Sequence, residues 1–265
     1  MNDQTANAIN VLGDFCGKRD VESLTVHDLQ NKYAIDQADV MVLFGGSIIC
    51  GGDVLAYAMQ NKVAGKYVIA GGAGHTTDNL RQRVHQEYPS IMTDGLPEAE
   101  IFNLYLDTVY GLKADYLEKK STNCGNNITY LLDLLRQNDI VFNSIILCQD
   151  ATMQRRMDAG LQKYVQDGVT IINYAAYKAE VIVRDDQLVY LSDIHGMWDM
   201  ERYVSLLMGE IPRLTDNADG YGPNGKNFIA HVDIPEQVNA AFEELKKIYG
   251  EAIRKANPLY ASTCL

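Results

Sequence analysis

Cysteine is scarce in this 265-residue chain, and the few cysteines are widely spaced. They form no C-x-x-C pair and no cysteine–histidine cluster, which excludes the common zinc-finger types. Such spacing is typical of a protein in a reducing compartment. Cys50 and Cys148 lie in or beside apolar runs, so we predict buried hydrophobic side chains there rather than nucleophiles. The others are Cys16, Cys124 and Cys264.

Long hydrophobic runs are also absent from the sequence. No apolar stretch approaches the roughly 18 to 20 residues that a membrane-spanning helix needs. The segment Met1–Thr5 has neither the basic residues nor the apolar stretch of a signal peptide. We therefore expect a cytoplasmic protein with no membrane partner.

Positive charge is in short supply. The chain has 23 basic and 35 acidic residues, for a formal net charge of −12. Long-range repulsion from this charge disfavours a nucleic-acid or anionic-membrane surface. Because 47% of the residues are hydrophobic, the chain can bury a large core. We expect a globular protein that binds a small molecule and no nucleic acid, in an oligomeric state that the sequence leaves open.

Familiar catalytic motifs are missing as well. The glycine-rich stretches lack the Lys-Ser or Lys-Thr of a Walker A loop, and residues 72–77 lack the third glycine of a dinucleotide fingerprint. The G-x-S-x-G and H-E-x-x-H patterns do not occur. His231 and Asp233 alternate without a third ligand, which is more typical of a structural pair. We predict no metal site.

Two apolar runs that end in glycines are the most informative feature of the sequence. Residues 39–44 and 67–70 read as buried strands, and the helical segment between them, 53–62, makes a right-handed βαβ unit plausible. Both glycine loops then emerge at one carboxyl edge of a parallel sheet, where ligands bind. The glycines either only turn the chain or admit a ligand to the main chain, before a helix predicted at 77–88. The candidate ligand-binding residues here are Gly45, Gly46, Ser47, Gly71, Gly72, Gly74 and His75.

A third apolar run, residues 144–148, delivers a polar segment to the same edge. An arginine beside a helix N-terminus favours phosphate or carboxylate. Asp150 can alternatively cap the helix that follows. Two adjacent arginines diverge by about 100° around a helix, so we expect at most one to face a cleft. The candidate ligand-binding residues in this segment are Gln149, Asp150, Thr152, Gln154, Arg155 and Arg156.

Two other predicted helices begin with polar side chains. Residues 121–127 carry more hydroxyl and amide groups than a helix cap requires, although capping explains one or two of them. Pro97 opens a helix predicted to extend to Gly111, and the acids in its first turn either stabilise the helix end or serve a site. The candidate ligand-binding residues in these two segments are Glu98, Ser121, Thr122, Asn123 and Asn127.

The alternation of strands and helices predicts an α/β fold with a mostly parallel sheet and a helical N-terminal segment. Residues 169–173 form a further predicted strand, and 180–191 form either a hairpin or a strand and a loop. Helical patterns dominate afterwards. We therefore predict an α/β domain over residues 1–195 and a smaller, mainly helical region over 196–265. The glycine-rich stretch 216–225 is either a surface loop or a lid.

Taken together, these segments resemble the bacterial YdcF, SanA and ElyC family, whose function is largely uncharacterised. The resemblance covers nearly the whole chain. It implies a Rossmann-like three-layer sandwich with a small, mainly helical C-terminal part, and a capacity to bind S-adenosylmethionine. One departure is Asn126, where the family usually has glutamate. The matching segments are Ala70-Gly71-Gly72, Gly74-His75, Glu98, 121–125, 149–150, 152–156, Trp198, 201–203, 219–223 and 231–233.

S-adenosylmethionine suits part of this residue pattern. Its carboxylate fits a helix N-terminus or an arginine, and its sulfonium tolerates an acidic protein. The usual methyltransferase loop, however, has an acidic residue just before its glycines, whereas Ala70 stands here. No acidic residue is evident at the end of the next strand to hold a ribose. Binding without methyl transfer is therefore compatible with the sequence, which leaves the reaction unknown.

Three functions are compatible with the sequence. The first is a small-molecule-binding protein that holds S-adenosylmethionine or a nucleotide-like ligand, with an unknown reaction. The second is a hydrolase or transferase for a phosphorylated metabolite, in which an arginine holds phosphate and Glu98, Asp150 or His75 moves a proton. The third is a non-catalytic regulator whose C-terminal loop binds a partner.

Overall fold

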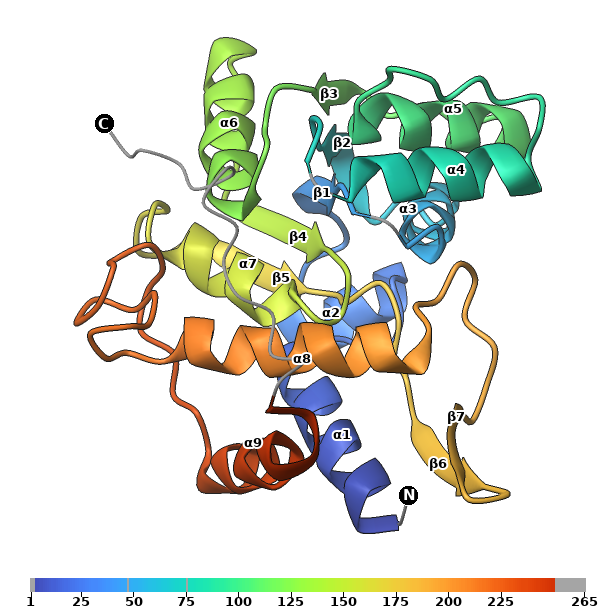
Figure 1. The fold of residues 1–265 in the computed structure, drawn as a ribbon. Helices are drawn as coiled ribbons and strands as arrows, with labels where there is room; N and C mark the ends of the chain where they lie inside the picture. The colour runs from blue at the N-terminus through green and yellow to red at the C-terminus, as the bar shows by residue number, and fades with distance from the viewer. Residues whose placement is uncertain (1–2, 47, 75, 251–265) are drawn as a thin grey trace.

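The computed structural model describes residues 3–46, 48–74 and 76–250, so Ser47, His75 and Cys264 lie outside the described residues. A five-stranded parallel sheet in the order β3-β2-β1-β4-β5 forms the centre of the fold (Figure 1). The α/β, Rossmann-like fold expected from the sequence is confirmed. The strands are β1 (Ala38–Phe44), β2 (Ala64–Ala70), β3 (Tyr116–Glu118), β4 (Ser144–Cys148) and β5 (Thr170–Asn173).

The predicted βαβ unit is present at the middle of the sheet. Helix α3 (Cys50–Gln60) connects β1 to β2, and these strands pair in parallel from Ala38 opposite Ala64 to Phe44 opposite Ala70. On its other side β1 pairs with β4, which comes much later in the chain. The direction of strand progression therefore reverses between β1 and β4, which is where open α/β sheets bind ligands.

Helices cover both faces of the sheet, which explains why its strands are continuous apolar runs. On one face Val42, Phe44 and Leu147 pack with α6 (Cys124–Gln137) and α7 (Gln154–Gln162). On the other face Leu43 and Ile146 join a larger cluster, to which several helices contribute. These are α1 (Asp3–Cys16), α2 (Val26–Tyr33), α3, α4 (Thr77–Glu87), α5 (Glu98–Tyr110), α8 (Met200–Leu214) and α9 (Glu236–Tyr249).

The N-terminal helix packs with the C-terminal helices. Helix α1 contacts α8 and α9, and it also contacts the strand β6 (Val181–Arg184) (Figure 1). The contacts of α1 with α8 and α9 join residues that the predicted division at residue 195 places in different parts of the chain. The division into residues 1–195 and 196–265 stays a prediction.

The segment after β5 contains a hairpin, which decides between the two structures left open by the sequence. Strand β6 pairs antiparallel with β7 (Gln187–Tyr190). Asp185 and Asp186 form the turn with φ of 50° and 58°. Positive φ at both central residues is the geometry that two-residue hairpin turns favour, and aspartate tolerates it better than most residues.

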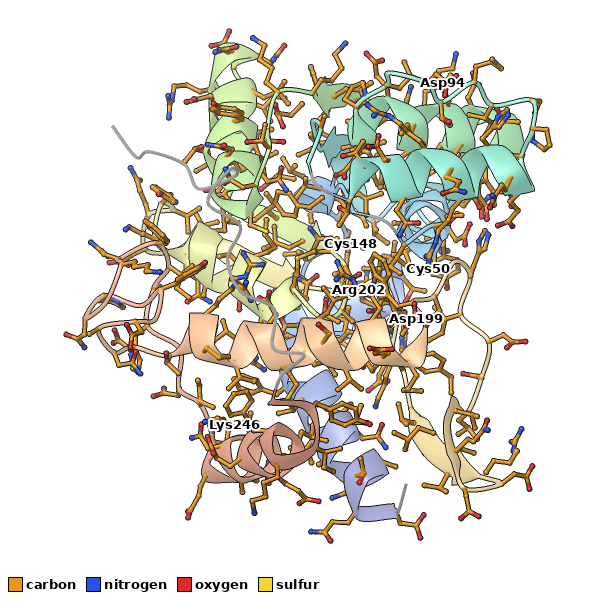
Figure 2. All side chains as sticks on the ribbon, viewed as in Figure 1. Cys50, Asp94, Cys148, Asp199, Arg202 and Lys246 are labelled. Carbon is orange, nitrogen blue, oxygen red and sulfur yellow. The ribbon has the colours of Figure 1, made fainter. Side chains whose placement is uncertain are left out.

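Two expectations about the interior can be compared with the structure. No helix in the described part of the chain is long and apolar enough to cross a membrane. Cys50 and Cys148 are buried, as predicted, and both lie toward the middle of the molecule (Figure 2). Burial raises the pKa of the Cys148 thiol to about 12. This disfavours the nucleophilic thiolate.

Candidate functional site

The carboxyl ends of β1 and β4 are joined by Gln149. Its side-chain Nε2 donates to the carbonyl oxygen of Gly45 at 3.2 Å, across the point where the strand order reverses. Its Oε1 accepts from the backbone N–H of Asp150 at 2.7 Å. The backbone N–H of Gln149 in turn donates to Oε1 of Gln154 at 2.8 Å. Gln149 and Gln154 are both buried. Their hydrogen bonds fix the chain at the reversal between β1 and β4, which is the topological switch point of the sheet.

Glu98 lies between the two glycine loops. As the first residue of α5, it donates its backbone N–H to the carbonyl of Gly72 at 2.9 Å. Its Oε1 accepts from the Thr77 hydroxyl at 2.8 Å. A Cβ atom added at Gly45 would collide with Oε2 of Glu98, and one added at Gly71 would lie 3.1 Å from the Glu98 Cβ. Both glycines therefore make room for a buried carboxyl at the ends of β1 and β2.

The environment of Glu98 suits it to exchange a proton near neutral pH. The residue is only 7% exposed. Burial raises the pKa of Glu98 to about 7, although hydrogen bonds from Thr77 and Thr76 act in the opposite direction. A carboxyl whose pKa lies near the working pH is the usual requirement for a general acid or base.

The pKa of Glu98 gives a testable pH dependence. Because the folded-state pKa lies above the ordinary value of 4.5, protonated Glu98 contributes stability that is complete below about pH 4.5 and is lost as the pH rises through about 7. Relative to Glu98→Gln, the unfolding free energy of the wild type should fall by about 1–3 kcal/mol between about pH 4 and about pH 8. Chemical denaturation at a series of pH values measures this difference. If the unfolding free energies of the two proteins change with pH in parallel, the raised pKa of Glu98 is contradicted. Glu100→Gln in the same helix is the control, because it removes a carboxylate that is only half-buried.

The second glycine loop packs tightly against the chain that follows β3. The backbone N–H of Gly72 donates to the Ser121 hydroxyl at 3.1 Å. A Cβ atom at Gly72 would collide with the carbonyl oxygen of Ser121 and lie 2.8 Å from its nitrogen. By contrast, the closest atom to a Cβ at Gly74 would be the carbonyl oxygen of Thr122, at 3.4 Å. Gly72 is therefore required by a close approach of two backbone segments.

A pair of alanine substitutions tests this difference between the glycines. Gly72→Ala should lower the unfolding free energy by about 1–3 kcal/mol or more, because backbone atoms rather than a flexible side chain must move. Gly74→Ala should change it by less than about 0.5 kcal/mol. Urea denaturation of both variants measures the two effects. Equal stabilities would show that the Ser121 segment does not constrain the loop.

Strand β3 supplies an acidic residue that the sequence analysis missed. The strand next to β2 ends at Glu118, so the expectation of no acidic residue at that position was wrong. Its Oε1 accepts from the backbone N–H groups of Lys120 and Ser121, at 2.6 and 3.0 Å. Its buried Oε2 has no hydrogen-bond partner within the described residues. The strand has only three residues, and two of them are half-buried, so no apolar run announced it.

The polar residues at the start of α6 divide into caps and a free amide. Asn123 is the N-cap, and its Oδ1 accepts from the backbone N–H of Asn126 at 3.0 Å. The Asn126 carboxamide accepts from the side chains of Asn123 and Thr122. Asn127 is buried, yet its side-chain amide has no hydrogen-bond partner in the described part of the chain. Asn127 is therefore a buried member of this segment with free hydrogen-bonding capacity.

Asp150 is enclosed by donors. Its Oδ1 accepts from the backbone N–H of Thr152 at 2.9 Å and from the hydroxyls of Thr152 and Tyr177, each at 2.8 Å. Its Oδ2 accepts from the indole Nε1 of Trp198 at 2.8 Å. Burial and the nearby Asp150 carboxylate raise the pKa of Tyr177 well above its usual value, so its hydroxyl stays a donor. Asp150 anchors three segments of the chain.

Neither arginine of α7 is free. Nε of Arg155 donates to the carbonyl oxygen of Phe15, and its guanidinium stacks 4.1 Å from the centre of the Phe15 ring. Arg156 forms a two-pronged ion pair with Glu210 of α8, at 2.5 and 3.0 Å. The two side chains diverge around the helix, as adjacent residues must. One contacts α1 and the other α8, so both hold helices in place.

The structure thus gathers most of the predicted residues at one edge and assigns many of them to packing. Gly45, Gly71, Glu98 and Gln149 meet at the ends of β1, β2 and β4, with Ser121 beyond Gly72. Within the described residues there is no group of three or more side chains that could hold a metal ion. No protein-family model matches the chain. Fold and site together define an α/β protein with polar groups at a parallel-sheet switch point.

Proposed function

We propose that this chain is a small-molecule-binding protein of the YdcF type, which holds S-adenosylmethionine or a similar nucleotide-like ligand at the carboxyl edge of the sheet. The observation that carries the proposal is the convergence of Gly45, Glu98 and Gln149 at the reversal between β1 and β4. Open parallel sheets bind nucleotide-like ligands at such a point. The resemblance to the YdcF, SanA and ElyC family and the cytoplasmic location are parts of the same proposal.

The charges around this edge favour such a ligand over a phosphate ester. Arg156 is paired with Glu210, and Arg155 donates Nε to Phe15 and stacks on its ring, so a phosphate would have to compete with these contacts. Glu98 and Glu118 place two carboxyl groups near the glycine loops. An ammonium, a sulfonium or the hydroxyls of a ribose suit these acceptors, while the N-terminus of α6 beside Asn127 suits a carboxylate. The residues present therefore fit S-adenosylmethionine.

Calorimetric titration of the full chain with S-adenosylmethionine tests the proposal. We expect saturable binding, weakened about fivefold to tenfold by Asn127→Ala, since one hydrogen bond is worth about 1 kcal/mol. Asn239→Ala, on the exposed side of α9, is the matched control and should bind as the wild type does. If the titration shows no heat of binding at millimolar S-adenosylmethionine, the proposal is contradicted. If Asn127→Ala and Asn239→Ala weaken the binding of S-adenosylmethionine equally, Asn127 does not contact the ligand.

A second candidate function is a hydrolase or transferase that moves a proton through Glu98. It is favoured by the buried position of this carboxyl and its pKa of about 7. From the sequence we expected an arginine of α7 to hold the phosphate. For Arg156 this would require its ion pair with Glu210 to rearrange. A panel of phosphate esters tests it. Turnover that Glu98→Gln abolishes, with ligand affinity retained, would support this second function, and no turnover on any ester counts against it.

A further inference from the structure

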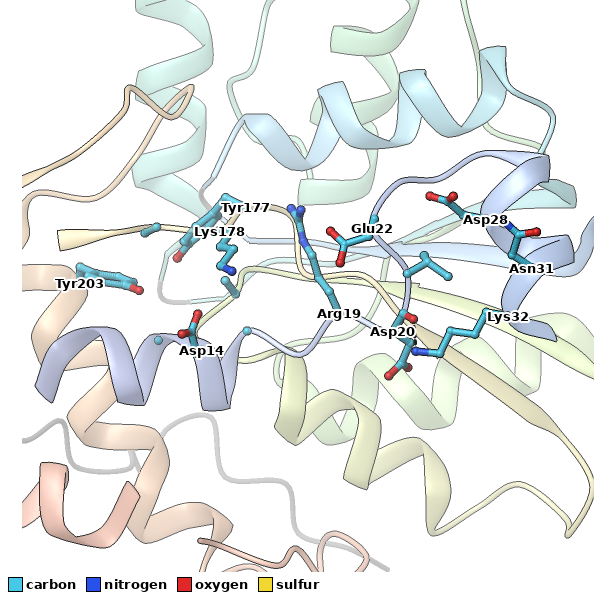
Figure 3. A pocket seen from close by; sticks show the side chains of 15 residues that line it. Asp14, Arg19, Asp20, Glu22, Asp28, Asn31, Lys32, Tyr177, Lys178 and Tyr203 are labelled. Carbon is cyan, nitrogen blue, oxygen red and sulfur yellow. Dashed lines mark hydrogen bonds between the residues drawn. The ribbon is translucent and has the colours of Figure 1, made fainter. Parts of the chain in front are cut away.

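A hollow lies beside Tyr177, the residue whose hydroxyl donates to Asp150. It is a cavity of about 590 Å³ between the end of α1, the segment 19–32 and the residues that follow β5 (Figure 3). None of the residues predicted from the sequence to bind ligand lines it. Its volume is within the range of small-molecule pockets. Any ligand here would be recognised by groups that the switch point does not contain.

Small residues leave room for a tyrosine hydroxyl at one end of this cavity. A Cβ atom at Gly13 of α1 would lie 2.6 Å from the hydroxyl oxygen of Tyr203. A glycine inside a helix costs about 0.5–1 kcal/mol relative to alanine, so the space has an energetic cost. Tyr203 is 1% exposed and lines the cavity. Within the described residues its hydroxyl makes no hydrogen bond, and burial raises its pKa, so it remains a free donor.

Two opposite charges face the same end of the cavity without pairing. Asp14 and Lys178 point toward the space in front of the Tyr203 hydroxyl (Figure 3). Neither side chain forms an ion pair or a hydrogen bond in the described part of the chain. Asp14 also lies in the last turn of α1, where the helix dipole disfavours an acidic residue. Its position therefore has no explanation in helix stability.

The total charge of the lining limits the kind of ligand. The cavity is lined by four acidic residues, Asp14, Asp20, Glu22 and Asp28, and three basic ones, Arg19, Lys32 and Lys178. Asp20 and Asp28 are already hydrogen-bonded, to Asn173 and Ser23 respectively. Arg19 is held against the Tyr174 ring. A near-neutral lining of this kind does not favour a polyphosphate or another multiply charged anion.

We propose that this cavity binds a small zwitterion that carries a primary ammonium and a carboxylate, of the α-amino acid class. The ammonium pairs with Asp14, and the carboxylate pairs with Lys178 and accepts from the Tyr203 hydroxyl. The rest of the ligand extends toward Arg19 and Glu22, which occupy the middle of the cavity (Figure 3). The two free charges and the free donor are thereby all satisfied by one molecule.

The experiment is a calorimetric titration of the full chain with each proteinogenic L-amino acid at millimolar concentration. At least one should bind saturably, and its N-acetyl and carboxamide derivatives should each bind at least about tenfold more weakly. Lys178→Gln and Asp14→Asn should weaken binding by a similar factor. Because both side chains are exposed and unpaired, these variants should melt at the wild-type temperature. Lys66→Gln and Asp94→Asn, at exposed positions outside the cavity lining, are the matched controls.

Each other outcome overturns the proposal. If none of the amino acids binds, the cavity is not a site for such a zwitterion. If binding is unchanged in both Lys178→Gln and Asp14→Asn, these two side chains do not contact the ligand. Displacement of the bound amino acid by adenosine, the part of S-adenosylmethionine that is not an amino acid, would mean that there is one site and not two. Conversely, Asn127→Ala should leave amino-acid binding unchanged. A failure of the switch-point proposal is therefore distinguishable from a failure of this one.

Discussion

Asp150→Ala should lower the unfolding free energy by about 3–5 kcal/mol, one of the two largest effects expected in this chain. The substitution leaves the Tyr177 hydroxyl and the Trp198 indole N–H buried without an acceptor. Each such unsatisfied group costs about 1–3 kcal/mol. The segment after β5 and the start of the C-terminal helices both depend on this carboxylate. Chemical denaturation followed by circular dichroism measures the loss.

A double-mutant cycle separates the hydrogen bonds from other effects of the Asp150 substitution. Trp198→Phe removes one of the donors, so its cost should be smaller in the Asp150→Ala background than in the wild type. Asp94→Ala, at an exposed position (Figure 2), is the control and should change stability by less than about 0.5 kcal/mol. Additive costs for the two substitutions at 150 and 198 would show that the indole does not depend on Asp150.

Breaking the ion pair between α7 and α8 should be equally severe. Arg156→Met leaves Glu210, whose side chain is 1% exposed, without its closest partner. Glu210→Leu leaves Arg156 as an uncompensated, mostly buried cation. Removal of one member of a buried pair costs about 3–5 kcal/mol, whereas exposed pairs are worth about 1 kcal/mol or less. Denaturation of both single variants and of Arg136→Met, from the exposed Asp133–Arg136 pair, tests this contrast.

The double variant Arg156→Met/Glu210→Leu gives the sharper test of this pair. Hydrophobic residues of similar size replace a buried ion pair at little cost, so the double variant should recover most of the stability that each single variant loses. A loss in the double variant equal to the sum of the single losses would contradict the pairing. It would mean that both side chains act through packing alone.

The strands of the sheet were predictable because both faces are covered by helices. Burial on both sides requires continuous apolar runs, and residues 39–44 and 144–148 stand out for that reason. Strand β3 escaped prediction because it has three residues, and its position beside β2 is fixed by tertiary pairing. Glu118, the acid at its end, was missed with it.

The roles of the candidate site residues depended on contacts that a single sequence does not contain. Gly72 was predicted as part of a ligand cradle, yet the atoms that exclude a side chain there belong to Ser121. The partners of Arg155 and Arg156 are Phe15 and Glu210, distant in sequence and on separate helices. What the pattern did predict was the meeting of the loops, because parallel strands all end at one edge.

A crystal structure of the chain in complex with S-adenosylmethionine tests the central claim most directly. The proposal predicts ligand density at the carboxyl ends of β1 and β4, in contact with Asn127 and with the loop that begins at Gly45. Glu98 should lie within hydrogen-bonding distance of the ligand. Density in the cavity beside Arg19 and Tyr203, with none at the switch point, would contradict the assignment of that edge as the nucleotide-like ligand site.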